Sequence, residues 1–179
     1  MVWKCRVMTP ECFTMPGELR LIVLCHVDDL LIAGNEVDIL IFKNYMQTNF
    51  EKITFEGNKN EIQYIGMIFK RYQDKIEVSQ PGYLNEIIRR FKLKPEENTA
   101  SSPATENITQ EWEEGEKIDV SEFRSKVMTI MFITRTWPDV KFPTMYLSAR
   151  MKDPKMSHGS KLTRIAQYLN GTQALRLTF

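Results

Sequence analysis

The stretch of sequence that decides the fold is LRLIVLCHVDDLLIAG, residues 19–34. Leucine, isoleucine and valine on both sides favour two short buried strands, and the polar break at Asp28 and Asp29 favours a tight turn between them. We therefore expect an antiparallel hairpin formed by residues 20–26 and 30–34. Both carboxylates should lie at its tip and be largely solvated, because burying a carboxylate without a partner is costly.

The residues after the hairpin predict one amphipathic helix and a small sheet. Asn35 is a suitable N-cap, and apolar residues recur at helical spacing through 36–50, at Ile39, Phe42, Met46 and Phe50. The segments KITFE, EIQYIGMIFKRY and KIEVSQ, separated by turn-like residues, then predict an antiparallel meander. A second helix is expected over 81–93, where Pro81 stands near the start and a missing N–H costs little.

Residues 94–119 differ in composition from everything before them. They lack apolar periodicity and are rich in Pro, Ser, Thr, Asn and Glu, which is typical of an exposed linker. Three helical stretches are expected after this segment, near 121–135, 139–151 and 158–170. The pattern as a whole therefore predicts the α+β class, with strands before the linker and helices after it.

The net charge of +1 conceals a strong asymmetry. Residues 94–119 hold eight acidic and two basic side chains. From Phe123 to Phe179 there are ten lysines or arginines and two acids, so this part carries +8. A basic region of this size is a footprint for a phosphate backbone, and it is equally well explained as a solvated helical surface balanced by the acidic segment.

The composition also indicates where the protein works. No run approaches the roughly 18–20 apolar residues of a membrane helix, and the N-terminal residues lack the apolar run of a signal peptide. The three cysteines, Cys5, Cys12 and Cys25, are odd in number and match no zinc pattern, so we interpret them as reduced thiols. We therefore expect an intracellular protein, cytoplasmic or nuclear, that is not secreted and has no membrane partner.

Two adjacent acids between apolar strands have two interpretations. They form either a plain solvent-exposed turn or part of a cation site. Mg²⁺ prefers carboxylate oxygens and keeps several waters, and polymerases hold two such ions that stabilise the attacking and leaving oxygens in phosphoryl transfer. Taken alone, the pair Asp28-Asp29 favours the plain turn.

The sequence around the pair shifts the balance from the plain turn toward the cation site. HVDDLLIAGN, residues 26–35, resembles the YVDD hairpin of reverse transcriptases in the form that copia-type retrotransposons carry it. Further segments resemble that family in the same order: EIQYIGMIF, IEVSQPGYLNEIIRRFKL, EFRSKVMTIMFITRTWPDVKF and LSARMKDPKMSHGSKLTRIAQYLNGT. Each motif is weak, but their order and spacing together are specific, and the likeness spans residues 19–172.

The resemblance implies a right-hand polymerase fold that acts on an RNA or DNA template-primer with dNTP substrates and Mg²⁺. Residues 1–93 would be a partial reverse-transcriptase palm, an antiparallel hairpin and meander with one helix. Residues 94–119 would be an acidic exposed linker. Residues 120–179 would be a basic, mostly helical region like a thumb or connection.

The resemblance also implies site residues. Asp28 and Asp29 would be catalytic and bind the metal, with Asp28 as the firmer ligand. His26 stands where the family has a tyrosine that helps pack the primer end, and it offers less stacking surface. His158 matches a family histidine and is expected to be structural, as a cap or hydrogen-bonding group. Contacts to the template-primer backbone, with a solubilising surface as the alternative, are implied for Arg135, Arg150, Lys161 and Arg164.

The family's palm also needs an aspartate from an earlier strand, in a segment similar to DV.TAFL.G, and no such segment precedes Asp28 in this sequence. Met128 and Trp137 stand where the family has Gly and Arg. We therefore expect a fragment of an RNA-directed DNA polymerase that is inactive alone, with the missing polymerase half as a potential partner. Two other interpretations remain open: a non-catalytic nucleic-acid-binding remnant of a transposon polyprotein, and a degenerate product without a selected role.

Overall fold

The computed structural model describes residues 2–7, 20–57, 60–94, 97–112 and 118–179. Cys12 lies outside these ranges. The described residues combine antiparallel strands with five α-helices, which confirms the expected α+β class. The chain divides into two compact units: one reaches to Glu77 and includes Phe179, and the other spans Val78–Thr178. We call them the sheet unit and the helical unit.

The first sheet carries the expected hairpin. Its strands are β1 (Val2–Val7), β2 (Leu21–His26), β3 (Asp29–Gly34) and β4 (Ile53–Gly57), in the order β2-β3-β1-β4. β2 pairs antiparallel with β3 from Leu21 opposite Gly34 to His26 opposite Asp29, so the predicted hairpin is confirmed. β1 pairs antiparallel with β3 on the other side and with β4.

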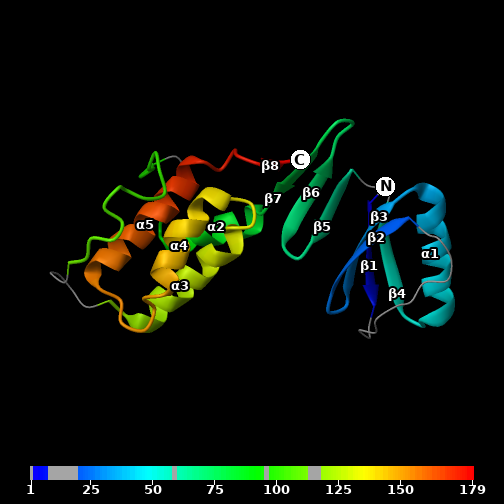
Figure 1. The fold of residues 1–179 in the computed structure, drawn as a ribbon, viewed down its shortest axis with the longest axis horizontal. Helices are drawn as coiled ribbons and strands as arrows, with labels where there is room; N and C mark the ends of the chain where they lie inside the picture. Colours follow the sequence, from blue (N-terminus) through cyan, green and yellow to red (C-terminus); the bar gives the residue numbers. More distant parts are fainter. Residues whose placement is uncertain (1, 8–19, 58–59, 95–96, 113–117) are drawn as a thin grey trace. The chain divides into compact units, whose positions relative to one another are not determined.

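Helix α1 (Glu36–Asn49) packs along one face of this sheet (Figure 1). Asn35 caps the helix as predicted, because its Oδ1 accepts a hydrogen bond from the Asp38 amide at 2.8 Å. The core between the helix and β3 consists of Leu30, Ile32, Ile39, Phe42 and Met46. Three of the four predicted apolar positions of the helix are therefore buried, and the fourth, Phe50, is half-buried just beyond its end.

The segment EIQYIGMIFKRY is a hairpin rather than the single strand of a meander. It forms β5 (Glu61–Tyr64) and β6 (Met67–Arg71), which pair antiparallel. The chain reverses at Ile65 and Gly66, whose φ values are 48° and 71°. Positive φ at both turn residues is the sign of a type I′ turn, which suits a two-residue hairpin.

The expected meander is also divided between two sheets. β4 joins the first sheet instead of pairing with β5. A second sheet has the order β5-β6-β7-β8, where β7 is Ile76–Ser79 and β8 is Leu177–Thr178. β8 is not predicted from the sequence, because two residues are too few to show a period-two pattern.

The helical unit contains the four remaining helices, close to their predicted ranges. They are α2 (Pro81–Arg90), α3 (Val120–Ile133), α4 (Lys141–Ser148) and α5 (Met156–Gly171), and the short 3₁₀ turn η1 (Pro138–Val140) precedes α4. Within the described ranges, no helix has the length and apolar character needed to cross a membrane.

A single apolar core joins these four helices. Its fully buried members include Ile87, Ile130, Val140, Leu147, Ile165 and Leu169. Because α2 contributes Leu84, Ile87 and Ile88 to this core, it packs with the C-terminal helices. The compact units consequently divide between Glu77 and Val78, whereas the sequence analysis placed a boundary after residue 93.

Residues 97–112, which we call the strap, run along the surface of the helical unit (Figure 1). Most of their side chains are exposed, as expected of a linker, but the segment is anchored. The Asn170 side chain donates hydrogen bonds to the carbonyls of Lys94 and Glu97 at 2.8 and 2.7 Å, and Ile108 is buried. The described part of the acidic segment therefore belongs to the fold of the helical unit.

Candidate functional site

The aspartate hairpin turns one residue earlier than the sequence predicts. His26 pairs with Asp29, so the turn consists of Val27 and Asp28, and Asp29 is already the first residue of β3. Val27 has a φ of 56°. A positive φ at only the first turn residue is the sign of a type II′ turn, whose twist suits a hairpin. For a β-branched residue this backbone conformation is strained, and such strain often occurs at functional sites.

The two carboxylates are less solvated than the sequence analysis predicted. Asp28 and Asp29 are both half-buried, and Oδ1 of Asp29 is shielded from solvent. Both residues also interact with other groups of the chain. Asp29 lies inside the sheet, next to the buried Leu30, instead of at the hairpin tip. The expectation that both carboxylates are largely solvated is therefore wrong.

His26 is the exposed last residue of β2, directly opposite Asp29. Side chains of residues paired in this way lie on the same face of the sheet, with Cβ atoms about 4.5–5.5 Å apart. The hairpin thus brings together the three residues of the sheet unit that the resemblance singled out. An imidazole beside a carboxylate can donate or accept a hydrogen bond, but it presents a smaller stacking surface than tyrosine.

The hairpin aspartates fit part of a Mg²⁺ site. Their carboxylate oxygens are the ligand type that the ion prefers. A two-ion site needs further carboxylates, yet β1, the strand beside β3, reads VWKCRV and places Arg6 opposite Asp29 in register. Within the described ranges, no three His, Cys, Asp or Glu side chains gather closely enough to hold a metal ion. The described residues therefore do not make up a complete two-ion site.

The first of the four implied backbone contacts, Arg135, is exposed after the end of α3. Its guanidinium lies over the ring of Phe132, 5.8 Å from the centroid. Phe132 stacks in turn on Tyr83, with ring centroids 5.2 Å apart and planes inclined by 2°. This cation–π contact orients Arg135 while leaving its charge facing solvent.

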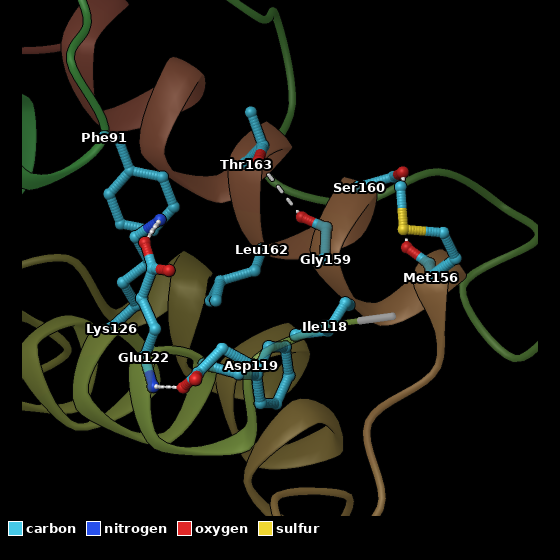
Figure 2. Close-up of a pocket in the computed structure, with 11 residues that line it drawn as sticks. Phe91, Ile118, Asp119, Glu122, Lys126, Met156, Gly159, Ser160, Leu162 and Thr163 are labelled. Carbon is cyan, nitrogen blue, oxygen red and sulfur yellow. Dashed lines mark hydrogen bonds and ion pairs between the residues drawn. The ribbon is translucent and has the colours of Figure 1, made fainter. Parts of the chain in front are cut away.

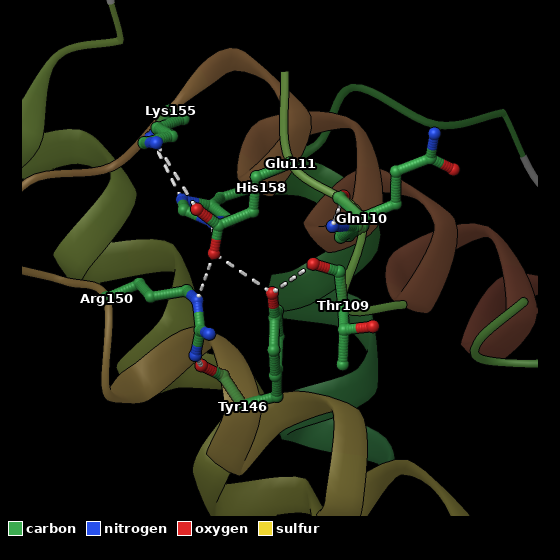
Figure 3. Close-up of polar contacts among 8 residues, drawn as sticks. Thr109, Gln110, Glu111, Tyr146, Arg150, Lys155 and His158 are labelled. Atoms are coloured by element: carbon green, nitrogen blue, oxygen red, sulfur yellow. Dashed lines mark hydrogen bonds and ion pairs between the residues drawn. The ribbon is translucent and has the colours of Figure 1, made fainter. Parts of the chain in front are cut away.

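The other three basic residues donate hydrogen bonds to the strap. Arg150 donates from Nε to Glu111 at 2.8 Å, Lys161 donates to the Gln110 carbonyl, and Arg164 donates to the Ser102 hydroxyl at 3.1 Å. Figure 3 shows the first of these groups, Arg150, beside Glu111 at the end of the strap. These three cations are therefore held by the chain itself.

His158 has the capping role that the sequence predicts, and a second contact that it does not. Its Nδ1 accepts a hydrogen bond from the Lys155 amide at 2.9 Å at the start of α5. Because Nδ1 accepts, the proton resides on Nε2. That Nε2 lies 3.2 Å from Glu111 Oε1. No motif or periodicity relates the strap to α5, so sequence reasoning did not find this pair.

The contacts around Glu111 shift the pKa values of several groups. The hydrogen bond from Arg150 and then the close approach of His158 lower the pKa of Glu111 from 4.5 to about 2. Burial lowers the pKa of His158, although the neighbouring Glu111 carboxylate acts in the opposite direction. At neutral pH the strap therefore presents an ionised carboxylate to a neutral imidazole and to the neighbouring cations.

A cavity of about 630 Å³ lies where α2, α3 and α5 meet (Figure 2). The charged side chains that line it already have partners within the chain. Lys126 Nζ lies 2.7 Å from Glu122 Oε1, and Asp119 Oδ1 accepts a hydrogen bond from the Glu122 amide at 2.7 Å. The remaining lining is largely apolar, including Phe91, Ile118, Phe123 and Leu162. None of the residues singled out by the sequence lines this cavity.

Comparisons with known proteins bear on the family. The retrovirus-related Pol polyprotein from transposon RE2 of Arabidopsis thaliana is 27% identical over 158 residues, which cover 87% of this chain and 11% of the relative. That from transposon RE1 of the same plant is 26% identical over 160 residues, covering 87% of this chain and 10% of the relative. An uncharacterized mitochondrial protein of Arabidopsis thaliana is 25% identical over 84% of this chain and 61% of its own length.

No family model and no solved structure matches the chain. The chain spans about a tenth of the length of the Pol polyproteins that it matches. The similarity is modest in identity but extends over most of this chain, in the way the sequence motifs indicated. The chain is therefore a homologue of the retrovirus-related Pol polyproteins of copia-like transposons.

Proposed function

We propose that the chain is a segment of a retrotransposon reverse transcriptase, and that Asp28 and Asp29 are two carboxylates of its polymerase metal site. The observation that carries this proposal is the geometry of the hairpin. Two adjacent aspartates stand at a two-residue turn with a strained Val27, on a strand whose following residues are buried. Such a turn holds both carboxylates on a rigid support, which a metal site requires.

The family relation supports the same proposal from an independent direction. The similarity to Pol polyproteins covers 87% of this chain, and the hairpin sequence HVDDLLIAGN resembles the polymerase motif of the family. In this proposal, template-primer and dNTP are the substrates, and Mg²⁺ supplies charge stabilisation for phosphoryl transfer. Asp28 and Asp29 would each offer carboxylate oxygens to the ion.

We propose further that this chain does not polymerise DNA by itself. Two carboxylates alone leave a two-ion site incomplete, and the described residues gather no third ligand around them. The purified chain should extend no primer on an RNA or DNA template with Mg²⁺ or Mn²⁺. Template-dependent incorporation that disappears in Asp28→Ala would refute this part of the proposal.

A second candidate function is non-catalytic nucleic-acid binding by the helical unit. Residues 123–179 carry +8, and Arg135 is exposed beside two stacked aromatic rings. In proteins that bind single strands, cations contact the phosphate backbone and aromatic side chains stack on the bases. We expect weak binding of a single-stranded oligonucleotide, with an affinity that falls steeply as salt rises. An affinity independent of salt, or no binding at low salt, would exclude this function.

A further inference from the structure

Four polar side-chain groups surround the carboxylate of Glu111 (Figure 3), and the nitrogen of one of them, Nε2 of His158, is buried close to it without an aligned hydrogen bond. Its oxygens lie 2.8 Å from Arg150 Nε, 3.1 Å from the Tyr146 hydroxyl, 3.3 Å from Lys155 Nζ and 3.2 Å from His158 Nε2. The donors belong to α4 and α5 and the residues between them, whereas the carboxylate belongs to the strap. A guanidinium, an ammonium, a hydroxyl and an imidazole N–H around one anion form a donor set that suits a phosphate group as well as a carboxylate.

Two of the four groups, His158 and Arg150, are also held by contacts that do not involve Glu111. His158 is 1% exposed, and its hydrogen bond from the Lys155 amide sets the ring orientation. The Arg150 guanidinium lies 3.5 Å from the centroid of the Tyr146 ring and donates to the Tyr146 carbonyl at 3.0 Å. The helices therefore supply a preorganised anion site, and the strap supplies its present occupant.

Among the described residues, the cations at this site outnumber the carboxylate. Arg150 and Lys155 contact Glu111 directly, and Lys161 adds a third positive charge next to them through its contact with the Gln110 carbonyl. Burial is the main cause that lowers the pKa of Lys161. The charge of Glu111 acts on the same ammonium group in the opposite direction. Within the described ranges, one carboxylate thus lies among three cations, and a phosphate group would bring more acceptor oxygens to the same donors.

We propose that Glu111 occupies a phosphate-binding site of the helical unit, and that residues 109–112 of the strap and an incoming phosphate group compete for it. The inference rests on the proposed nucleic-acid binding for the natural source of that phosphate, a nucleic-acid backbone. Because the strap is covalently attached, its effective concentration at the site is high. A single phosphate ion therefore displaces it only at high concentration, whereas a strand with several contacts does so more readily.

The first test compares two charge-neutralising variants of the strap. Glu111→Gln removes the competing charge, and Glu106→Gln makes the same change at an exposed strap position. Measured by fluorescence anisotropy, labelled single-stranded RNA and DNA should bind Glu111→Gln about 5–10-fold more tightly than the parent chain. The salt slope should also steepen by about 1. Glu106→Gln should shift the affinity by less than about twofold. Equal affinities of the two variants would overturn the proposal.

The second test identifies the donors. In a Glu111→Gln background, Arg150→Gln removes the guanidinium that lies closest to the carboxylate. The gain in oligonucleotide affinity should disappear in this double variant, because the freed site has lost its strongest donor. A gain that persists in full would show that the oligonucleotide uses other cations, and would also overturn the proposal.

The third test uses the parent chain and inorganic phosphate. The Ser157 amide donates to the Trp112 carbonyl at 3.5 Å, so its hydrogen exchange reports release of this end of the strap. Phosphate should accelerate that exchange relative to chloride at equal ionic strength. The Ala100 amide, which donates to Gln167 near the other end of the strap, should be unaffected.

The tests also separate the inference from the function on which it rests. If no oligonucleotide binds the parent chain or Glu111→Gln, nucleic-acid binding by the helical unit is refuted. Acceleration at Ser157 by phosphate would then support a site for the free ion. Unchanged exchange at Ser157 would refute the phosphate site itself, whatever the oligonucleotides do.

Discussion

Val27 is a β-branched residue with a φ of 56°, and it is 65% exposed, so little packing compensates for its strain. Strain of this kind costs on the order of 1–3 kcal/mol. Glycine adopts the conformation freely but loses about 0.5–1 kcal/mol through its larger unfolded-state entropy. We therefore expect Val27→Gly to raise the free energy of unfolding of the sheet unit by about 1 kcal/mol, measured by urea denaturation.

A matched control is available in the same hairpin. Val23 is also exposed, at 37%, and is absent from the positive-φ residues of the described chain. Val23→Gly should lower the free energy of unfolding by about 1 kcal/mol, because it removes a good strand former. If both variants lose stability equally, Val27 is not strained.

Glu111 makes stability depend on acid pH. Its pKa is lowered from 4.5 to about 2, chiefly by the hydrogen bond from Arg150, so the folded state favours the ionised carboxylate. The stabilisation is therefore complete above pH 4.5 and is lost as the pH falls toward 2. We expect the melting temperature of the helical unit to fall across this range, and to fall less in Glu111→Gln.

Two comparisons sharpen this pH experiment. Hydrogen bonds from Arg89 and Arg90 likewise lower the pKa of Glu86 to about 2. Protonation of Glu86 therefore lowers the stability of both the parent chain and Glu111→Gln over the same pH range. Glu106→Gln should keep the pH dependence of the parent chain. A Glu111→Gln variant with the full acid-dependent loss would show that the contacts of Glu111 do not stabilise the fold.

At the scale of the secondary-structure elements, strand β2 has an exposed edge and exposed apolar side chains that favour self-association. In the described part of the chain it is an edge strand, and Ile22 and Leu24 are 67% and 53% exposed. Unpaired strand edges and exposed apolar side chains promote association. We expect the purified chain to self-associate, and Ile22→Thr with Leu24→Thr to reduce the association measured by light scattering.

The control for this prediction is Leu40→Gln, which changes an apolar side chain of similar exposure, 56%, on α1. It leaves the strand edge as it is, so it should alter association less than the β2 variant. A monodisperse parent chain would contradict the prediction, and so would an equal effect of both changes.

Some elements could be predicted from the sequence and others could not, for identifiable reasons. The helices were predicted because apolar side chains such as Ile39, Phe42 and Met46 recur at helical spacing. The apolar pattern does not reveal the turn at Ile65-Gly66, because apolar residues continue through it on both sides. The pairing of β4 with β1 was also missed, because it joins strands distant in sequence and leaves no local signal.

At the scale of the whole molecule, the sequence singled out candidate site residues but not the contacts between them. Asp28 and Asp29 were recognisable from their apolar flanks and from the family motif. Arg150 and Lys161 were also singled out, but their partners lie in the strap, whose composition resembles that of an unattached linker. A tertiary contact between a segment without periodicity and two helices can be found only in the structure.

The central claim is that the hairpin of Asp28 and Asp29 is a divalent-cation ligand pair in a reverse-transcriptase segment. The most direct test is paramagnetic broadening of assigned amide resonances by substoichiometric Mn²⁺. The resonances of residues 27–30 should broaden first, and Asp28→Asn with Asp29→Asn should abolish the effect, whereas Asp74→Asn in the exposed turn before β7 should not. Sharp hairpin resonances while other acidic residues broaden, or an unchanged pattern in the double variant, would contradict the claim.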